Sequence, residues 1–124
     1  MVIGIGTDIL KIQRIRDGLG RGSEAFLKKS FTSREREQAA ERSDPALFYA
    51  TRFAGKEAVF KCFGVSGDGI RLDDIEILGA ETGAPEVALF GHAREIARQK
   101  GITNIRISLS YDGEYAVAFA LAEG

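Results

Sequence analysis

The segment 45–64 (PALFYATRFAGKEAVFKCFG) constrains the fold more than any other part of the chain. Pro45 suits the first turn of a helix, Ser43 can cap that turn, and Gly64 suits the helix end. Apolar residues cover most of the circumference of this helix, and a helix of this kind is normally buried on several sides. We therefore expect one long central helix with other elements packed around it.

Four charged residues are set into this apolar helix: Arg52, Lys56, Glu57 and Lys61. Glu57 and Lys61 are four residues apart and share one face. An ordinary helix-stabilising ion pair would account for that spacing. The apolar surroundings favour a binding site instead, because buried charges are costly unless they are paired or bind a ligand.

The composition is that of a globular protein and excludes several classes of function. Hydrophobic residues make up 44% and charged residues 28% of the 124 residues, which suits a single domain with its own core. No apolar run is long enough to cross a membrane, and the N-terminus lacks the basic start of a secretory signal. Cys62 is the only cysteine, which excludes an internal disulfide and a cysteine-based zinc cluster. We expect a cytoplasmic protein with no membrane contact.

Charge is unevenly distributed along the chain. Residues 1–63 contain 12 Lys and Arg against 8 Asp and Glu, whereas residues 64–124 contain 5 against 10. A basic patch in the first part consists of Lys11, Arg14, Arg16, Arg21, Lys28 and Lys29. It could bind an acidic protein or a phosphate-rich ligand, or only face solvent. It lacks the aromatic residues and the fold motif that would favour nucleic acid.

The hydrophobic pattern predicts one α+β domain, residues 1–124, with helices packed on a mostly antiparallel sheet. Strands are expected at 2–9, 74–78, 86–90, 104–111 and 114–121, and further helices at 9–19, 23–31, 32–42 and 92–100. The pair Asp112-Gly113 predicts a hairpin. The last strand is apolar on both faces, so we expect helices or another copy of the protein to cover them.

Local signals add three expectations. Gly4 and Gly6 indicate that a neighbouring element approaches the first strand closely. Thr32 followed by Glu35 fits a capping box at the start of segment 32–42, which is strongly charged and expected to be exposed. Residues 64–70 (GVSGDGI) predict a flexible turn, and they are not a phosphate-binding loop.

Nucleophilic catalysis by cysteine or histidine is poorly supported. Cys62 falls at a helix C-terminus, where the helix dipole disfavours a thiolate, so we interpret it as a core residue. His92 is the only histidine and begins a predicted helix, where it suits the surface or a cap. The remaining candidates are carboxylates and cations.

Asp8 lies at the end of the first predicted strand and is either a plain helix cap or part of a site. With Glu57 it could bind magnesium, which takes one or two protein carboxylates and completes its shell with water and phosphate oxygens. Lys61, Lys56 and Arg52 could face the same phosphates. Such a group fits a substrate with a pyrophosphate, although the sequence alone does not show that Asp8 and Glu57 meet.

Several of these residues lie in motifs that resemble a known family. The main ones are Gly4-Ile-Gly-Thr-Asp8 and Arg52-Phe-Ala-Gly-Lys-Glu-Ala-Val-Phe-Lys61. Weaker matches are segments 8–15 (DILKIQRI), 31–35 (FTSRE), 83–85 (GAP) and 108–110 (SLS). In this order and spacing they resemble the phosphopantetheinyl transferases, and the chain length resembles their short bacterial type.

The resemblance implies transfer of phosphopantetheine from coenzyme A to a serine of an apo acyl carrier protein. It also implies a magnesium requirement, adenosine 3',5'-bisphosphate as the by-product, and a role in fatty-acid or polyketide biosynthesis. By position, Asp8, Glu57 and Lys61 would be catalytic, and Asp8 and Glu57 would bind the metal. Contacts with coenzyme A are implied for Arg52, Lys56, Lys61, Gly64, Gly83, Pro85 and Ser110.

The resemblance further implies that Arg14, Arg21 and Lys29 touch the acidic carrier protein. Short family members form homotrimers with active sites between subunits. One departure is Tyr111, which stands where many relatives have histidine, since a phenol can donate a hydrogen bond but cannot become cationic. The alternatives are a catalytically silent module that binds coenzyme A or a carrier protein, and a small structural protein with an ion-pair helix.

Overall fold

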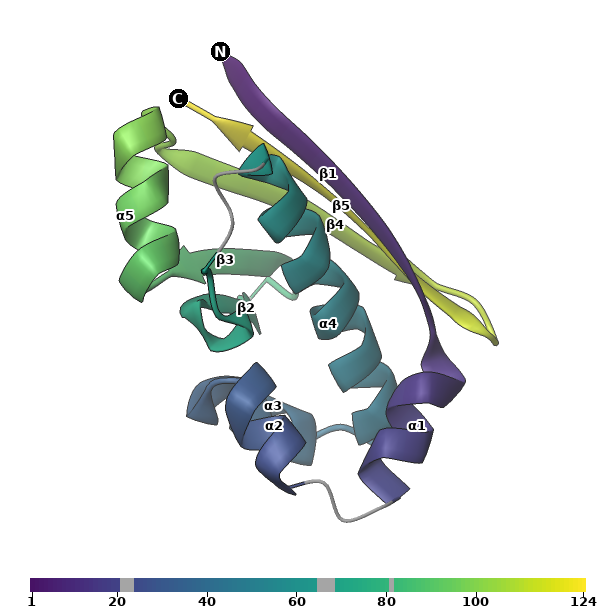
Figure 1. Ribbon diagram of the computed structural model, residues 1–124. Helices are drawn as coiled ribbons and strands as arrows, with labels where there is room; N and C mark the ends of the chain where they lie inside the picture. The colour runs from purple at the N-terminus through teal and green to yellow at the C-terminus, as the bar shows by residue number, and fades with distance from the viewer. Residues whose placement is uncertain (21–23, 65–68, 81) are drawn as a thin grey trace.

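The computed structural model describes residues 1–20, 24–64, 69–80 and 82–124. Their elements run in this order: β1 (Val2–Lys11), α1 (Ile12–Gly20), α2 (Glu24–Ser30), α3 (Ser33–Ala40), α4 (Pro45–Cys62), the 3-10 turn η2 (Leu72–Asp74), β2 (Ile75–Gly79), β3 (Pro85–Leu89), α5 (Gly91–Lys100), β4 (Asn104–Tyr111) and β5 (Tyr115–Glu123). Figure 1 shows helices packed against antiparallel strands. The predicted α+β class is therefore confirmed. In the described part of the chain, no helix is long and apolar enough to cross a membrane.

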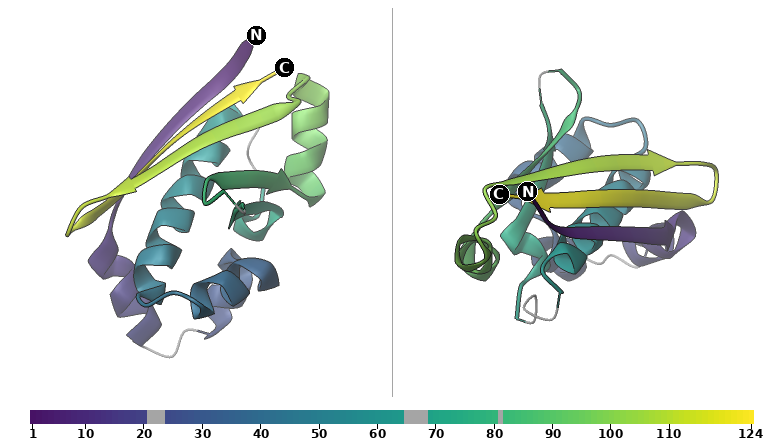
Figure 2. Two further views of the ribbon diagram at one scale, coloured as in Figure 1. Left: turned by 180° about the vertical axis from the view of Figure 1, so that it is seen from behind. Right: turned by 90° about the horizontal axis from the view of Figure 1, so that it is seen from above.

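The strands form two antiparallel sheets. One has three strands in the order β1-β5-β4, and the other is the β2-β3 hairpin. The Asp112-Gly113 hairpin is confirmed, and the Asp112 carboxylate accepts hydrogen bonds of 2.8 Å from the backbone N–H groups of Glu114 and Tyr115. The two ends of the chain lie side by side, where β1 pairs with β5 (Figure 2). There the Gly124 N–H donates a hydrogen bond of 3.0 Å to the Met1 carbonyl.

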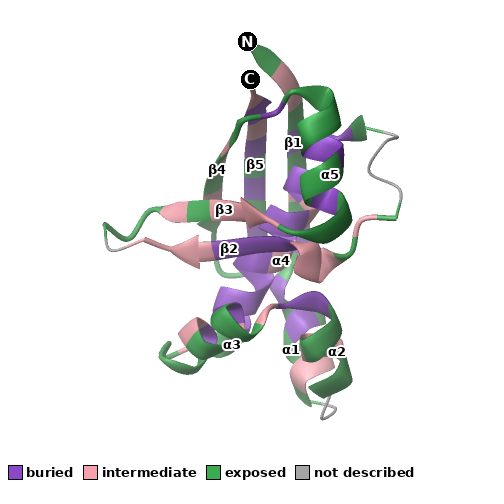
Figure 3. Cartoon of the chain, turned by 90° about the vertical axis from the view of Figure 1, so that its left-hand side faces the viewer, coloured by how far each residue is buried: buried purple, intermediate pink, exposed green. Residues whose placement is uncertain are grey.

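Helix α4 is the central element, as predicted, and most of its residues are buried (Figure 3). Pro45 occupies its first turn. The cap differs from the prediction, because the side chain of Asp44 rather than Ser43 accepts from the Leu47 N–H at 3.4 Å. The helix ends at Cys62, and Gly64 then adopts a positive φ of 62° that favours glycine.

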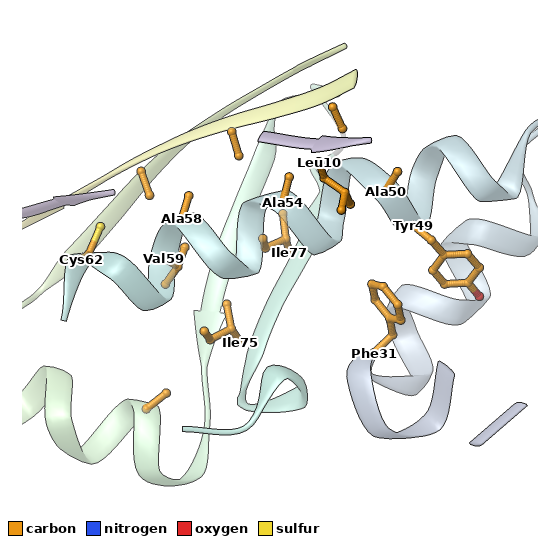
Figure 4. Packing of buried hydrophobic residues seen from close by; sticks show 14 of the residues in the cluster. Leu10, Phe31, Tyr49, Ala50, Ala54, Ala58, Val59, Cys62, Ile75 and Ile77 are labelled. Carbon is orange, nitrogen blue, oxygen red and sulfur yellow. The ribbon is translucent and has the colours of Figure 1, made fainter. Parts of the chain in front are cut away.

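Helix α4 lies very close to the three-stranded sheet because small residues line both surfaces. The inward side chains of β5 are alanines with no exposed surface: Ala116, Ala118, Ala120 and Ala122. Figure 4 shows Ala54 and Ala58 of α4 facing the strands. A side chain at Gly6 would collide with the backbone carbonyl of Ala58, and one at Gly4 with that of Cys62. The close approach expected from these two glycines is confirmed.

The other face of this sheet is exposed, and on β1 and β5 it is mainly apolar. Ile5 and Ile9 of β1 are 60% and 65% exposed, and Phe119 of β5 is 45% exposed. Register places Ile5 opposite Leu121, and Ile9 opposite Val117. No described element covers this outer face (Figure 2). We expected both faces of β5 to be covered. Within one chain, α4 covers one face, and the other face is exposed.

Several predicted boundaries and exposures need correction. β1 continues to Lys11, so Asp8 lies within the strand and does not cap α1. The capping box of Thr32 and Glu35 is confirmed, yet Glu35 is fully buried although its segment was expected to be exposed. Cys62 is buried, and burial raises the pKa of its thiol to about 11, which confirms its place in the core. Most of the predicted turn at 64–70 lies outside the described residues.

Candidate active site

Asp8, Glu57 and Lys61 come together where β1 meets α4. The Lys61 ammonium lies 3.3 Å from Asp8 Oδ1 and donates to the Thr7 carbonyl at 2.9 Å. The pKa of Glu57 is raised, first by burial and then by the negative charge of Asp8, while Lys61 opposes the shift. The structure thus brings together three residues that are separated by up to 53 positions in sequence.

The local fold explains this convergence. Gly6 lets β1 approach the backbone of α4 at Ala58, so that Asp8, two residues further along the strand, reaches the helix face that carries Glu57 and Lys61. These two residues share that face because they are one helical turn apart. The convergence that the sequence could only suggest is therefore a consequence of close strand–helix packing.

The donor set at this position fits magnesium. Asp8 and Glu57 supply hard carboxylate oxygens, and burial, followed by the negative charge of Asp8, raises the pKa of Glu57. A divalent cation would relieve the repulsion between the two charges. Among residues 1–20, 24–64, 69–80 and 82–124, no cluster of three or more His, Cys, Asp or Glu side chains is placed to hold a metal. Two carboxylates suit an ion that shares its shell with substrate phosphates and water.

A pocket of about 390 Å³ lies beyond the other edge of the sheet. It is formed by the first turns of α4, the loop before it, the β2–β3 turn and the end of β4. Arg52, Gly83 and Pro85, three of the residues predicted to contact coenzyme A, line it together, and Tyr111 lines it as well. The left-handed φ of 89° at Gly83 explains why glycine stands in this turn.

Two guanidinium groups, those of Arg42 and Arg52, line this pocket together. Arg52 and Arg42 both lie over the ring of Phe48, with distances of 4.1 Å and 5.0 Å to its centroid. Burial, and then the charge of Arg42, lowers the pKa of Arg52 to about 10. Arg52 Nε is buried and has no hydrogen-bond partner in the described part of the chain. Two close positive charges with an unused donor favour an anion.

Sequence reasoning missed Arg42. It stands three residues before the long helix in a charged segment and matches none of the motifs. Its only sequence signal is its position next to a helix start, where the chain turns and side chains from the preceding loop can reach the first turns of the helix. Without the fold, that signal does not separate Arg42 from the neighbouring surface charges.

The structure contradicts the predicted phosphate contact of Lys56. Its ammonium is fully buried, lies 2.7 Å from Glu35 Oε1, and donates to the carbonyls of Leu72 (2.8 Å) and Ile75. All three donors are used inside the protein. Lys56 therefore joins α4 to α3 and the start of β2, and it does not face a ligand site.

The remaining predicted residues lie apart from these two features. Gly64 is exposed just after α4, and Ser110 is exposed on the outer sheet face opposite Val117. Arg14 on α1 and Lys29 on α2 are exposed, while Arg21 lies outside the described residues. Elsewhere in the basic patch, Arg16 forms a bidentate ion pair with Asp44 at 3.0 Å and 2.8 Å.

The carboxylate–lysine group and the arginine pocket lie on opposite sides of the molecule. The first is at the β1 edge of the three-stranded sheet and the second at its β4 edge, with β5 between them. On α4, Arg52 and Lys61 are about two and a half turns apart and point to opposite sides of the helix. One chain therefore does not bring all predicted site residues into a single cleft.

Comparison with known proteins identifies the family of the chain. Residues 4–120 match the family model of the 4'-phosphopantetheinyl transferase superfamily. A holo-[acyl-carrier-protein] synthase of Desulforudis audaxviator is 43% identical over 124 residues, covering 100% of this chain and 95% of the relative. The crystal structure of such a synthase from Neisseria meningitidis superposes with a TM-score of 0.88 at 30% identity and covers 100% of both chains. The Helicobacter pylori synthase, solved in complex with coenzyme A, has a TM-score of 0.81 at 28% identity and covers 96% of this chain and 99% of that one.

The chain therefore belongs to the 4'-phosphopantetheinyl transferase superfamily. Within it, the chain is an enzyme of the holo-[acyl-carrier-protein] synthase type, since full-length relatives with about two-fifths identical residues are synthases of this kind. The resemblance seen in the sequence is confirmed, and the alternative of a small structural protein is excluded.

Proposed function

We propose that the protein transfers phosphopantetheine from coenzyme A to a serine hydroxyl of an apo acyl carrier protein and releases adenosine 3',5'-bisphosphate. The observation that carries this proposal is the meeting of Asp8, Glu57 and Lys61 at the β1–α4 contact. The names of the relatives support the carrier protein as acceptor, and the coenzyme A complex of the Helicobacter pylori synthase supports the donor. Carrier proteins of fatty-acid synthesis are the first acceptors to test, and those of polyketide synthesis the next.

Asp8 and Glu57 are the residues that would hold magnesium, which when bound would offset negative charge on the pyrophosphate of coenzyme A. Glu57 takes the proton of the attacking serine, and its raised pKa makes it a stronger base than an ordinary carboxylate. The serine oxygen forms a bond to the phosphorus next to the pantetheine arm, and the bond from that phosphorus to the bridging oxygen breaks. Lys61 protonates or neutralises the leaving phosphate, and half of its side chain is exposed where substrate would arrive.

The arginine pocket is the proposed site for the nucleotide end of coenzyme A. Arg52 and Arg42 would bind its phosphates, and Gly83 and Pro85 would contact the nucleotide. Because this pocket and the carboxylate–lysine group lie at opposite sheet edges, one coenzyme A would join the pocket of one subunit to the catalytic group of another. Gly64 and Ser110 are also proposed to contact the coenzyme A that lies between the two subunits.

This division of the site supports a homotrimer with active sites between subunits. The exposed apolar face with Ile5, Ile9 and Phe119 is the surface that such an assembly would bury. Phe119→Asp would place a charge in that interface, so sedimentation should show smaller species and turnover should be lost while the fold survives. A trimeric and active Phe119→Asp variant would contradict the proposed assembly.

The exposed basic residues Arg14 and Lys29, together with Arg21, are the proposed docking site for an acidic carrier protein. Exposed charges are screened within about 8–10 Å at physiological salt, so salt should raise the KM for the carrier protein more than the KM for coenzyme A. Arg16 should contribute less to docking, because Asp44 already holds its guanidinium.

The direct test is intact-mass spectrometry of an apo acyl carrier protein after incubation with this protein, coenzyme A and magnesium. We expect the carrier to gain the mass of one phosphopantetheine, and a chelator should abolish the gain. Glu57→Gln should fold but give no product. Binding of coenzyme A without transfer to any carrier would instead favour a catalytically silent module.

A further inference from the structure

Lys61 makes two contacts that place its charge against the candidate metal site. Its ammonium lies 3.3 Å from Asp8 Oδ1 and donates a 2.9 Å hydrogen bond to the Thr7 carbonyl. Asp8 is largely buried, with 18% of its side chain exposed, whereas Lys61 is 52% exposed. The more buried carboxylate is thus paired with the tip of a long, half-exposed side chain that can move into solvent at low cost.

We propose that Lys61 and the divalent cation compete for Asp8, so that metal binding displaces the lysine ammonium and turns it toward the substrate phosphate. This inference rests on the proposed metal site at Asp8 and Glu57. A cation that coordinates Asp8 meets a positive charge already within ion-pair distance of one of its oxygens. Because like charges repel at this range, the lysine must withdraw for the metal to bind tightly.

The competition gives the site an order of events. Metal alone binds weakly, because Lys61 holds Asp8. A phosphate group that attracts Lys61 removes the competitor and strengthens metal binding, and by reciprocity the metal strengthens phosphate binding. The same lysine thereby links arrival of the metal to its own placement beside the leaving group.

The experiment is a titration of each protein with Mn²⁺ alone, followed by the paramagnetic signal of the free ion and by calorimetry. Lys61→Met removes the charge and keeps a side chain of similar length. Lys11→Met is the matched control, because Lys11 lies on β1, the strand that carries Asp8, and its side chain makes no hydrogen bond or ion pair with the described residues. Lys61→Arg keeps the charge at the original position.

We expect Lys61→Met to bind Mn²⁺ more tightly than the wild type by up to about fivefold, since an exposed ion pair is worth up to about 1 kcal/mol, which corresponds to about fivefold. Lys11→Met and Lys61→Arg should resemble the wild type. Equal or weaker binding by Lys61→Met, or no measurable binding by it, overturns the competition. A tightening of the same size in Lys11→Met overturns it too, because general charge removal would then suffice.

Asp8→Asn, also titrated with Mn²⁺, separates this inference from the proposed function. If Asp8→Asn does not bind Mn²⁺ while Lys61→Met does, the ion occupies the proposed site. If Asp8→Asn binds Mn²⁺ as tightly as the wild type does, the metal lies elsewhere, and both the proposed metal site and the competition fail. If Asp8→Asn loses binding but Lys61→Met matches the wild type, the metal site stands and only the competition fails.

Discussion

Replacing Lys56 with methionine should destabilise the fold strongly. Lys56 and Glu35 have no exposed side-chain surface, and their charged atoms are 2.7 Å apart. Removing one partner of a buried pair leaves an uncompensated charge, at a cost of about 3–5 kcal/mol. We expect about 3 kcal/mol, at the lower end, because Glu35 keeps hydrogen bonds from the backbone N–H groups of Thr32 (2.9 Å) and Ile77 (2.8 Å). Urea unfolding at neutral pH measures the loss.

The size of that loss should depend on pH. Burial raises the pKa of Glu35 above its ordinary 4.5, and Lys56 opposes this shift, so the variant should have a still higher folded pKa. A carboxyl with a raised folded pKa costs little stability below pH 4.5, and the cost grows as the pH rises toward the folded pKa. Adding Glu35→Gln to the variant removes the charge and should recover much of the stability. A loss below about 1 kcal/mol, or one independent of pH, would refute this reasoning.

Two further predictions concern the β1–α4 contact. Glu57→Gln should raise the melting temperature at pH 8, because burial and the charge of Asp8 raise the pKa of Glu57 and its ionised form therefore destabilises the folded state. This gain in melting temperature should disappear below pH 4.5. Magnesium should stabilise the wild type but not the variant. Scanning calorimetry across pH tests this, and a lower melting temperature at pH 8 would contradict it. Gly6→Ala should cost about 1–3 kcal/mol and weaken metal binding, since its side chain meets the backbone of α4. Gly18→Ala, where a side chain meets nothing within 4 Å, should instead stabilise by about 0.5–1 kcal/mol; equal effects in the two glycine variants would argue against the close approach.

The fold was predictable wherever one residue pattern has one physical solution. The apolar circumference of segment 45–64 requires burial on several sides, and α4 is indeed the central helix. Asp112-Gly113 requires a tight turn, and Gly4 and Gly6 require a close neighbour, although the sequence does not say which one. Strand ends were less predictable, because Ile9 and Leu10 suit a strand as well as a helix. In the structure β1 continues to Lys11, so that Asp8 lies within the strand and faces α4.

The directions of the charges on α4 could not be predicted from spacing. Lys56 and Glu57 are neighbours in sequence, yet Lys56 pairs with the buried Glu35 of α3, whereas burial and the charge of Asp8 on β1 raise the pKa of Glu57. In a helix with one polar stripe, exposure would tell the ligand-facing residues from the others. α4 has no such stripe, so the elements packed on each side decide what each charge meets.

The charged residues of α4 have two different roles: Lys56 holds the fold together, and Glu57 belongs to the proposed site. A buried cation such as Lys56 needs an acid that the fold supplies, and Glu35 is placed by the capping box of α3 with Thr32. Once that pair fixes the rotation of α4, Glu57 is held toward β1, one residue further round the helix. The proposed catalytic group is therefore oriented by an ion pair on another face, which is why we expect loss of Lys56 to reduce stability without removing a ligand contact.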